Sequence, residues 1–382
     1  MQIHARHYRT GKPVAVSLVG NIIESVTDSD RPTADLPFIA PAFFDPQING
    51  HGGIWFSGDQ LTPRKVLDAL LPQFQFGVAR MFPTLITASP ESLEAGFLAI
   101  RRACEMEPFA DELIAGCHLE GPFLSAEDGP RGAHQREFIR PANWDEFAKL
   151  QDLSGNRIRL VTLAPEVEGA IEFIQRAVEE GVTIAIGHTA ASTDQIAAAV
   201  DVGATLSTHL GNGAHPVLPR HPNYIWDQLA DSRLAASIIA DGFHLPDSVI
   251  RSFIAAKGTD RVVLTSDASG LAGCDPGRYS IHGVDVEVEA SKRICIADEP
   301  GLLAGSGSSI LDCVNHLVRS GITELADAID MAGRTVTRVL GLAPMTLEAR
   351  QRADLIVFDS TETEPVRLIG TMAAGAIRYS KT

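Results

Sequence analysis

The sequence lacks several features that would each point to a particular class of protein. No cysteines have the CxxC spacing, and the five cysteines are scattered, as is typical of reduced thiols in a cytoplasmic protein. No dense basic run offsets the net charge of −16, so nucleic acids and anionic membrane surfaces are excluded as expected partners. No stretch approaches ~20 consecutive apolar residues, and the N-terminus has no apolar signal region, so we expect neither a membrane span nor a secretory signal.

Nucleotide-binding motifs are also missing. The glycine-rich run LLAGSGSS at 302–309 contains neither a GxxxxGK[ST] loop nor a strand–GxGxxG–helix unit. There is also no repeat at a solenoid period and no low-complexity segment. These absences exclude nucleotide phosphate binding and a repeat architecture from what we expect of this chain.

What the chain does contain is eight short apolar runs, each of which ends in polar residues. Helix-like stretches separate most of them, and alternating strands and helices of this number predict an α/β fold, a closed (β/α)8 TIM barrel. The runs are AFFDPQING, ARMFPTLIT, LIAGCHLEGPF, IRLVTLAPE, VTIAIGHTAAS, ATLSTHLGNG, LAASIIADGFHLP and RVVLTSDASG. The expected helices are 62–76, 90–106, 144–150, 168–180, 192–202, 247–257, 308–320 and 322–340.

The two ends of the chain do not match the barrel pattern. Residues 1–40 and 348–382 contain short β-prone pieces around turn residues, and neither end could bury a core alone. We therefore predict that both termini form one small β-sandwich beside a barrel of residues 41–347. The alternating segment 279–296 predicts a β-hairpin inserted after the eighth strand.

Glu120 is the first candidate functional residue, because it ends an apolar strand in the motif HLEGPF. A carboxylate here could cap the next helix or pair with an arginine. A buried charge without a partner is costly, however, and a metal ion would be such a partner. We favour the ligand interpretation.

Two histidines occupy equivalent places on successive strands, His188 in IGHTAAS and His209 in STHLGNG. One such histidine is more often a hydrogen-bonded core residue, but two at neighbouring strand ends favour a metal site. Asp267 ends the eighth strand in LTSDASG and could be an N-cap or a general base.

The first strand ends with Gln47 and Asn49, where many metallohydrolase barrels have two histidines that bind a second metal. Amides are weak ligands for such an ion, so the sequence predicts one tightly bound metal. We treat the nearby His51 as a loop residue, with contact to the metal or the substrate as the alternative. In other loops, His134, His244 and Arg220 would each be ordinary surface residues if considered alone.

Together these motifs resemble the amidohydrolase superfamily and, within it, the family of N-acetylglucosamine-6-phosphate deacetylases. They occur in the family's order over nearly the whole chain. They are DPQINGHGG, FPTLIT, HLEGPF, APE, IGHTAAS, THLGNG, IADGFH, TSDASG, LAGS, AGRTVTRVLGL and ADLIVF. The resemblance implies a TIM barrel with a small β-sandwich built from both termini, usually as a homodimer.

The resemblance also implies roles for the residues at the metal. Glu120, His188 and His209 would bind one divalent ion, with zinc favoured and iron, cobalt or manganese as alternatives. Asp267 would activate water, and His134 would help to polarise the amide carbonyl. The reaction would remove acetate from an N-acetylated amino sugar.

Further residues would contact that sugar. The resemblance assigns His244 and Arg220 to the sugar phosphate, with Arg220 reaching across the dimer. Backbone groups of Asn212 and Gly213 are further donors. Gln47 and Asn49 match the single-metal branch of the family and are candidate substrate contacts.

The segment after His209 departs from the family pattern, because it has Gly-Asn-Gly-Ala-His at 211–215 and a long loop at 215–227. This departure leaves open whether the sugar is 6-phosphorylated, and the role of His215 is not assigned. The alternatives are an amidohydrolase for another small amide, such as a non-phosphorylated acylamino sugar or a cyclic imide, and a non-catalytic barrel subunit.

Overall fold

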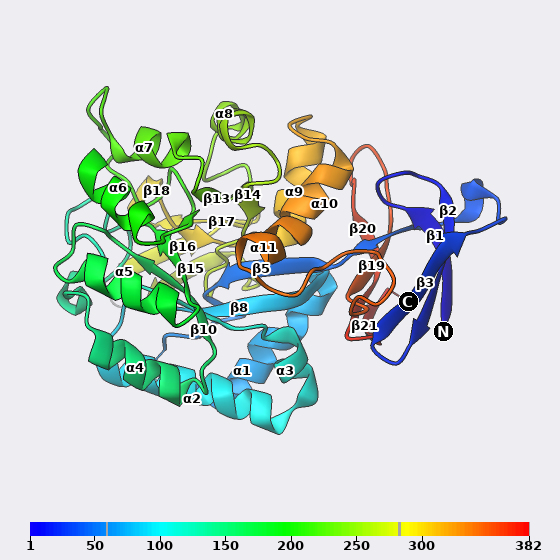
Figure 1. The fold of residues 1–382 in the computed structure, drawn as a ribbon, viewed down its shortest axis with the longest axis horizontal. Helices are drawn as coiled ribbons and strands as arrows, with labels where there is room; N and C mark the ends of the chain where they lie inside the picture. Colours follow the sequence, from blue (N-terminus) through cyan, green and yellow to red (C-terminus); the bar gives the residue numbers. More distant parts are fainter. Residues whose placement is uncertain (59, 282–283, 382) are drawn as a thin grey trace.

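The centre of the molecule is an eight-stranded parallel sheet that closes almost completely into a barrel (Figure 1). The computed structural model describes residues 1–58, 60–281 and 284–381. A bridge between Ile48 of the first strand and Ala268, four residues beyond the last strand, nearly closes the sheet, so it is a TIM barrel as predicted. Each of the eight apolar runs supplies one strand: β5 (Phe43–Ile48), β8 (Val78–Ile86), β9 (Cys117–Glu120), β10 (Ile158–Leu163), β11 (Thr183–Ile186), β12 (Leu206–Ser207), β13 (Ala235–Ile238) and β14 (Val262–Leu264).

Helices cover the outside of the barrel, and side-chain caps fix where several of them begin. Thr62, Ser89, Ser192 and Ser309 each accept a hydrogen bond from a backbone N–H of the first turn, as N-caps do. The α-helices are α1 (Pro63–Leu70), α2 (Pro90–Met106), α3 (Pro108–Leu113), α4 (Trp144–Leu153), α5 (Ala170–Glu179), α6 (Thr193–Asp201), α7 (Tyr224–Ala230), α8 (Asp247–Lys257), α9 (Ile310–Arg319), α10 (Leu325–Met331) and α11 (Arg334–Val339). Short 3-10 helices are η1 (Thr33–Asp35), η2 (Leu71–Phe76) and η3 (Arg136–Phe138).

The sequence pattern missed two short helices and merged two others. It gave no helix at α3, and it treated the start of α7 as loop, because a helix of six or seven residues shows too few turns for its period to be recognised. In α7, Asn223 caps the helix through its side-chain oxygen. The predicted helix 322–340 is divided into α10 and α11 at Gly333.

Strands from both termini form a separate, sandwich-like domain beside the barrel, as the sequence predicted (Figure 1). The strand order is β21-β20-β19-β4-β1-β2-β3, so β4 joins the N-terminal strands to the C-terminal ones. Alternate residues of β19 pack into two different hydrophobic cores. Leu355 packs in the core of the terminal domain, and Ile356 packs in the core of the barrel. The strands are β1 (Gln2–His7), β2 (Pro13–Val19), β3 (Ile22–Asp28), β4 (Phe38–Pro41), β19 (Leu355–Asp359), β20 (Arg367–Ala373) and β21 (Ala376–Ser380).

The segment predicted as one hairpin is a larger antiparallel sheet of four strands. The sheet is built from β15 (Gly277–Ile281), β16 (Val284–Val288), β17 (Arg293–Ile296) and β18 (Glu299–Ser306). The expected hairpin, 279–296, includes positions 282–283, which lie outside the described residues. The glycine-rich run at 302–309 forms the last part of β18 and ends at Ser309, the N-cap of α9. A two-stranded ribbon, β6 (Gly50–His51) with β7 (Ile54–Trp55), follows the first barrel strand.

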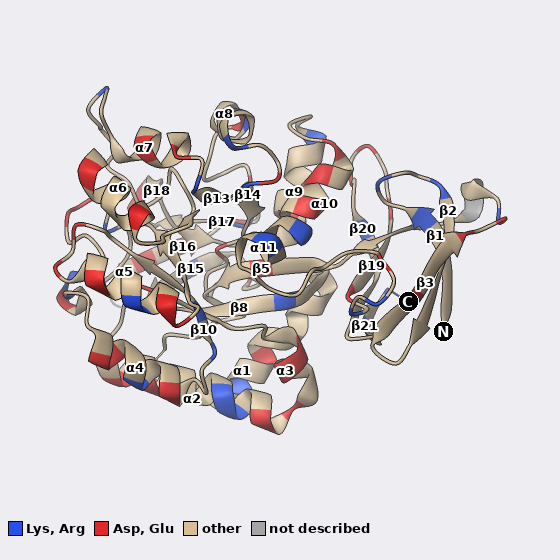
Figure 2. Cartoon of the chain, in the orientation of Figure 1, with Lys and Arg blue, Asp and Glu red and all other residues tan. Residues whose placement is uncertain are grey.

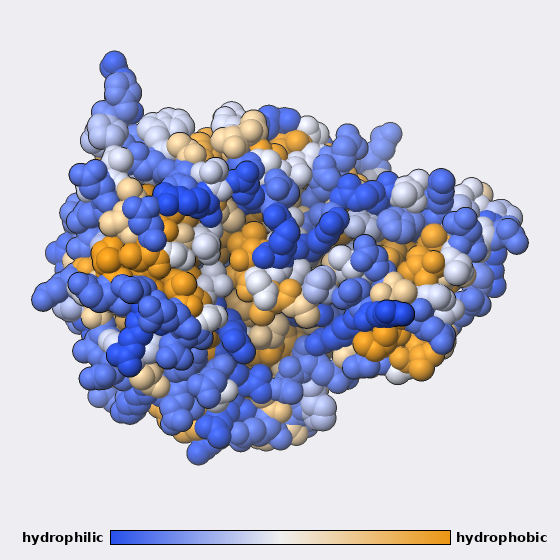
Figure 3. Space-filling model, in the orientation of Figure 1, coloured by the Kyte–Doolittle hydropathy of each residue, from blue (hydrophilic) through white to orange (hydrophobic). Residues whose placement is uncertain are grey.

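Charge lies on the outside and apolar side chains inside. Acidic positions lie along covering helices such as α4 and α10 (Figure 2). The face shown in Figure 3 is mostly hydrophilic, with separate apolar patches over the barrel and the terminal sheet. Among the described residues, no helix is long and apolar enough to span a bilayer.

Candidate active site and metal centre

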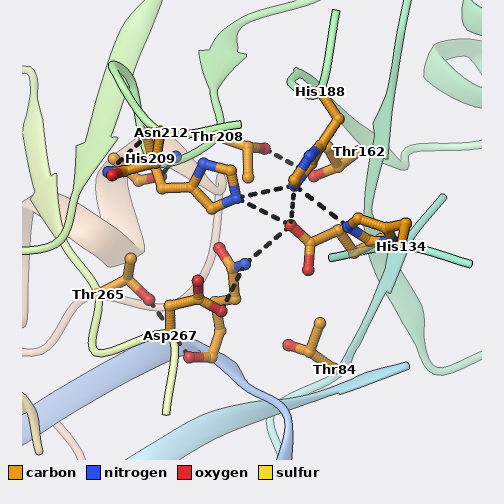
Figure 4. A network of polar contacts seen from close by, with 12 residues as sticks. Thr84, His134, Thr162, His188, Thr208, His209, Asn212, Thr265 and Asp267 are labelled. Carbon is orange, nitrogen blue, oxygen red and sulfur yellow. Dashed lines mark hydrogen bonds and ion pairs between the residues drawn. The ribbon is translucent and has the colours of Figure 1, made fainter. Parts of the chain in front are cut away.

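Three donor atoms from three different strand ends meet at one edge of the barrel. Glu120 is the last residue of β9, whereas His188 and His209 each follow a short strand by two residues. Glu120 Oε1 lies 3.2 Å from His188 Nε2 and 3.0 Å from His209 Nε2, and the two nitrogens are 3.1 Å apart (Figure 4). All three residues are buried. The predicted ligand set is therefore brought together as a nearly equilateral triangle.

The backbone at this edge is strained in a consistent way. His188, His209 and Asp267 have φ values of 51°, 28° and 49°, in the left-handed region that non-glycine residues rarely adopt. Each such residue costs on the order of 1–3 kcal/mol, so other contacts must hold it. The His209 N–H donates to Ser237 Oγ at 2.7 Å, and the His188 carbonyl accepts from Ser125 N–H at 3.0 Å. Strain concentrated at three strand ends supports a functional role for this edge.

The donor set suits a tetrahedral metal ion. His188 Nδ1 donates to the Pro130 carbonyl at 2.8 Å, which leaves the Nε2 lone pair facing Glu120 and His209. Without a cation, two imidazole nitrogens and a carboxylate oxygen would crowd together at hydrogen-bond distance. Ligands ~2.1 Å from a tetrahedral zinc ion lie about 3.4 Å from one another, a little more than the separations here. The residues present fit the ion that the fold family implies.

His134 is a fourth donor at the same place. Its Nε2 atom lies 3.2 Å from His188 Nε2, and Glu120, His134 and His188 by themselves form a group able to hold a metal. Thr87 Oγ1 lies 2.9 Å from His134 Nδ1. Burial lowers the pKa of His134 to about 3, so the imidazole is neutral. His134 could thus serve either as a ligand or as a hydrogen-bond donor to substrate.

Gln47 and Asn49 face the carboxylates of this site. The Gln47 amide nitrogen donates to Glu120 Oε1 at 3.0 Å and to Asp267 Oδ1 at 2.9 Å. The Asn49 amide nitrogen donates to the same Asp267 oxygen at 2.7 Å. Both amide nitrogens therefore donate to these carboxylates, and the expectation of one metal ion stays a prediction. Their predicted contact with substrate stays a prediction.

The two carboxyl groups have opposite electrostatic environments. Burial opposes ionisation of Glu120, but its contacts with His188 and His209 hold its pKa well below the usual range. Burial, together with the charge of Glu120, raises the pKa of Asp267 to about 6. Glu120 is thus suited to remain a charged ligand, and Asp267 to exchange a proton.

The loop after β12 reaches the site only in part. The Asn212 amide nitrogen donates to the His209 carbonyl at 3.3 Å, so it steadies that histidine. A Cβ at Gly213 would lie 2.6 Å from His188 Nδ1, so only glycine allows this close approach. Arg220 is exposed, and no hydrogen bond or ion pair of its guanidinium occurs within the described part of the chain. Within one chain, the structure does not bring Arg220 to the other site residues.

His244 and His51 have different surroundings. His244 follows β13, and its Nδ1 lies 2.8 Å from Asp241 Oδ2. The Asp241 carboxylate also accepts a hydrogen bond from Ser306 Oγ at 3.3 Å, and the Ser306 N–H donates to the Asp267 carbonyl at 3.4 Å, so the turn of His244 lies beside the strand end of Asp267. His51 is the last residue of the two-residue strand β6, so its prediction as a loop residue was wrong, and it lines a cavity of about 220 Å³ with Phe76 and Cys274.

Some residues at this edge were not found from the sequence. Asp45 accepts hydrogen bonds from Thr265 Oγ1 at 2.9 Å and from the Ser266 N–H at 3.2 Å, and so joins the first strand to the last. His118 is fully buried below Glu120, where Thr162 Oγ1 lies 2.8 Å from its Nε2. Both residues lie inside motifs that the sequence analysis recognised, DPQIN and HLEGPF. Their place in these motifs was the only feature of the sequence that could have pointed to them.

His215, to which the sequence assigned no role, connects two loops over the site. Its backbone N–H donates to the Tyr224 hydroxyl at 2.8 Å, and its Nε2 lies 3.2 Å from Glu127 Oε2. The loop of Glu127 also carries Pro130 and His134. His215 therefore holds the loop after β12 against the loop after β9.

Known proteins share both this fold and much of this sequence. N-acetylgalactosamine-6-phosphate deacetylase of Escherichia coli O157:H7 is 31% identical over 349 residues, which cover 90% of this chain and 88% of that protein. Human N-acetylglucosamine-6-phosphate deacetylase is 32% identical over 342 residues, which cover 85% of this chain and 80% of the human protein. The crystal structure of N-acetyl-D-glucosamine-6-phosphate deacetylase from Mycobacterium smegmatis has a TM-score of 0.87 at 30% identity, covering 99% of each chain. No family model matches the chain.

A barrel with a carboxylate and histidines at its strand ends defines a metal-dependent hydrolase of the amidohydrolase superfamily. Enamidase, a member of that superfamily, shares the fold at 15% identity with a TM-score of 0.56. From its similarity to the curated relatives, the chain belongs to the family of N-acetylglucosamine-6-phosphate deacetylases.

Proposed function

We propose that this chain removes acetate from N-acetyl-D-glucosamine 6-phosphate to give glucosamine 6-phosphate. The observation that carries the proposal is the triangle of Glu120, His188 and His209 with Asp267 held beside it by two amides. Relatives named for the glucosamine and galactosamine sugars both match, and they support an N-acetylated amino-sugar phosphate as the substrate class.

Glu120, His188 and His209 would hold one divalent ion, with zinc favoured and iron, cobalt or manganese as alternatives. When bound, such an ion polarises the amide carbonyl and makes water a stronger nucleophile. Gln47 and Asn49 keep amide donors pointed at the carboxylates, so we assign one ion per chain.

Asp267 is the proposed proton carrier. Its Oδ1 atom is occupied by the two amide donors, and its Oδ2 atom accepts no hydrogen bond within the described residues. Oδ2 would take the proton of the attacking water and return it to the departing amine, which is otherwise a poor leaving group.

His134 would hold the acetyl carbonyl. If the Thr87 hydroxyl donates to Nδ1, the proton of the neutral ring is on Nε2 and faces the site. A neutral donor polarises the carbonyl oxygen without giving up its proton.

The sugar and its phosphate would lie against the loops after β12 and β13. We assign His244 and Arg220 to the phosphate and the backbone of Asn212 and Gly213 to further contacts, because a dianion in a chain of net charge −16 needs local cations. Arg220 is exposed beside Val217, which is 84% exposed, and this supports a homodimer in which Arg220 reaches the neighbouring site.

Two broader assignments complete the proposal. The domain division is 1–40 with 348–382 for the terminal sheet, and 41–347 for the barrel. The five free cysteines support a cytoplasmic location.

The test compares acetate release from phosphorylated and unphosphorylated N-acetylhexosamines by wild-type protein and Arg220→Ala. We expect the variant to raise KM for the phosphorylated sugar far more than for the unphosphorylated one. Equal effects, or a wild-type preference for the unphosphorylated sugar, would indicate a different acylamino sugar. Stoichiometric metal without turnover on any amide would indicate a non-catalytic subunit.

A further inference from the structure

A buried carboxylate lies directly behind His244. The Asp241 side chain is 1% exposed, and its Oδ2 atom is 2.8 Å from His244 Nδ1. The other oxygen, Oδ1, accepts the backbone N–H groups of Phe243 at 2.9 Å and His244 at 3.0 Å. Asp241 thus closes a tight turn with one oxygen and faces the imidazole with the other.

This contact determines which ring nitrogen of His244 carries a proton. An ionised carboxylate only accepts hydrogen bonds, so Nδ1 must be the donor. The contact with His244 holds the pKa of Asp241 below its usual range despite burial, so the group is ionised at neutral pH. With Nδ1 donating to Asp241, Nε2 is the atom left for a ligand. Nε2 can donate to a phosphate oxygen only when the ring carries its second proton as well, and the neighbouring carboxylate charge favours that doubly protonated ring. The ring cannot rotate without breaking a buried ionic hydrogen bond.

Asp241 also touches the segment that carries Asp267. Ser306 Oγ donates to Asp241 Oδ2 at 3.3 Å. The Ser306 carbonyl accepts the Ser269 N–H at 2.8 Å, and Ser306 pairs as a parallel bridge with Ala268, next to Asp267. One buried carboxylate therefore joins the loop of His244 to the end of the eighth strand.

We propose that Asp241 is a positioning residue. It keeps Nδ1 of His244 protonated and fixes the orientation of the ring, so that Nε2 faces the substrate beside the strand end of Asp267. The proposal rests on the proposed function, because it takes the contact between His244 and the anionic sugar from there. Asp241 itself does not touch the substrate.

The test variant is Asp241→Asn in the full-length enzyme loaded with metal. Asparagine keeps an oxygen for the two backbone N–H groups and places an NH₂ group against His244 Nδ1. The neutral ring must then accept at Nδ1 and carry its proton on Nε2. ¹⁵N NMR of histidine-labelled protein, with the His244 signal assigned by its loss in His244→Gln, should show a protonated Nδ1 in wild type, and in Asp241→Asn a ring that has lost this proton and its charge and is protonated on Nε2 alone.

The kinetic counterpart is a selective effect on substrate binding. We expect KM for the phosphorylated sugar to rise roughly 10-fold, the scale for losing a carboxylate behind a functional histidine, while kcat changes much less.

Asp247→Asn is the matched control. Asp247 Oδ1 lies 2.9 Å from His316 Nε2, and His316 packs under the same turn, where a Cβ at Gly242 would lie 2.8 Å from its ring. The control removes a carboxylate–histidine contact next to the turn without touching His244, so KM should stay near the wild-type value.

Three results would overturn the positioning role. They are an unchanged His244 tautomer in Asp241→Asn, equal KM effects in the test and control variants, and a loss of thermal stability with unchanged KM. Failure of the proposed function would look different: wild-type protein would release no acetate from any N-acetylhexosamine phosphate, whatever the tautomer of His244.

Discussion

Two groups of buried carboxylates in this molecule have opposite surroundings. Asp354, at the junction of the terminal sheet and the barrel, is 2% exposed and lies 2.8 Å from Arg80 Nε and 2.9 Å from Arg352 Nε. It also accepts the Ala374 N–H at 2.8 Å. This carboxylate has cations and a backbone donor that belong to the chain itself.

Glu120 and Asp267 at the barrel edge have no arginine or lysine partner within the described residues. Their contacts are imidazoles and amides, and the charge of Glu120 raises the pKa of Asp267. A buried charge is expensive unless it is paired. The comparison teaches that Asp354, which is fully paired, holds the structure together, whereas Glu120 and Asp267, which repel each other without a cation of the chain, lie where the proposed ion from outside would bind.

The largest expected effect is the loss of metal and activity when a histidine at the barrel edge is removed, an effect that we do not expect at Asp354. His188→Ala or His209→Ala should lose the ion and at least ~10³-fold in activity, because the several kcal/mol supplied by the metal are lost with it. Wild-type protein should contain about one tightly bound ion per chain, as three ligands with one open position imply. Metal analysis beside acetate release checks both. Two fully occupied, protein-ligated ions would contradict the single-metal site.

Arg80→Met should reduce stability and leave metal content and turnover unchanged. It leaves Asp354 buried without its main cation, so we expect a loss of about 3–5 kcal/mol in the free energy of unfolding. Metal content and kcat of the folded fraction should stay near wild type, because Arg80 lies at the other end of the barrel strand β8 from the site. Urea unfolding of the metal-free proteins provides the measurement, and a loss of metal without a loss of stability would refute the comparison.

Asp267→Asn should reduce turnover by ~10²-fold or more, the usual scale for losing general acid–base catalysis, and keep the metal. The metal-free variant should be at least as stable as wild type, because a carboxyl group facing Glu120 has been neutralised. Near-normal turnover in this variant would remove Asp267 from the mechanism.

The smallest effect is a pH dependence of stability. Burial is the main cause that lowers the pKa of His118 to about 4, from about 6.5 in the unfolded chain. The unfolded state therefore binds the extra proton first, and stability present above pH 6.5 is lost as the pH falls toward 4. At pH 5 the protonation of this histidine in the unfolded state has lowered the free energy of unfolding by about 2 kcal/mol. His118→Gln should show a shallower decline in metal-free urea titrations between pH 7 and pH 5, and an unchanged slope would show that His118 does not contribute.

Much of the fold could be predicted because the barrel strands are local features. Short apolar runs followed at once by Glu120, His188, His209 and Asp267 give both the strand and the chemistry at its end. The short helices α3 and α7 and the four-stranded sheet β15–β18 were missed or simplified, because few residues show a period there. The loop 215–227 was recognised as unusual, but its contact with Glu127 could not be inferred across 88 positions.

The sequence by itself determined the barrel strands and the candidate metal ligands at their ends, since each depends on residues close together in the chain. The joining of the termini could be predicted for a different reason, because neither end has enough apolar residues to bury a core alone. Only the tertiary structure decided that Gln47 and Asn49 donate to Asp267, that Gly213 makes room for His188, and that Asp241 lies behind His244. These contacts depend on side-chain direction and on closure of the barrel. A pattern of residue types along the chain fixes neither of these, because atoms that meet within 3 Å can come from positions more than 200 residues apart.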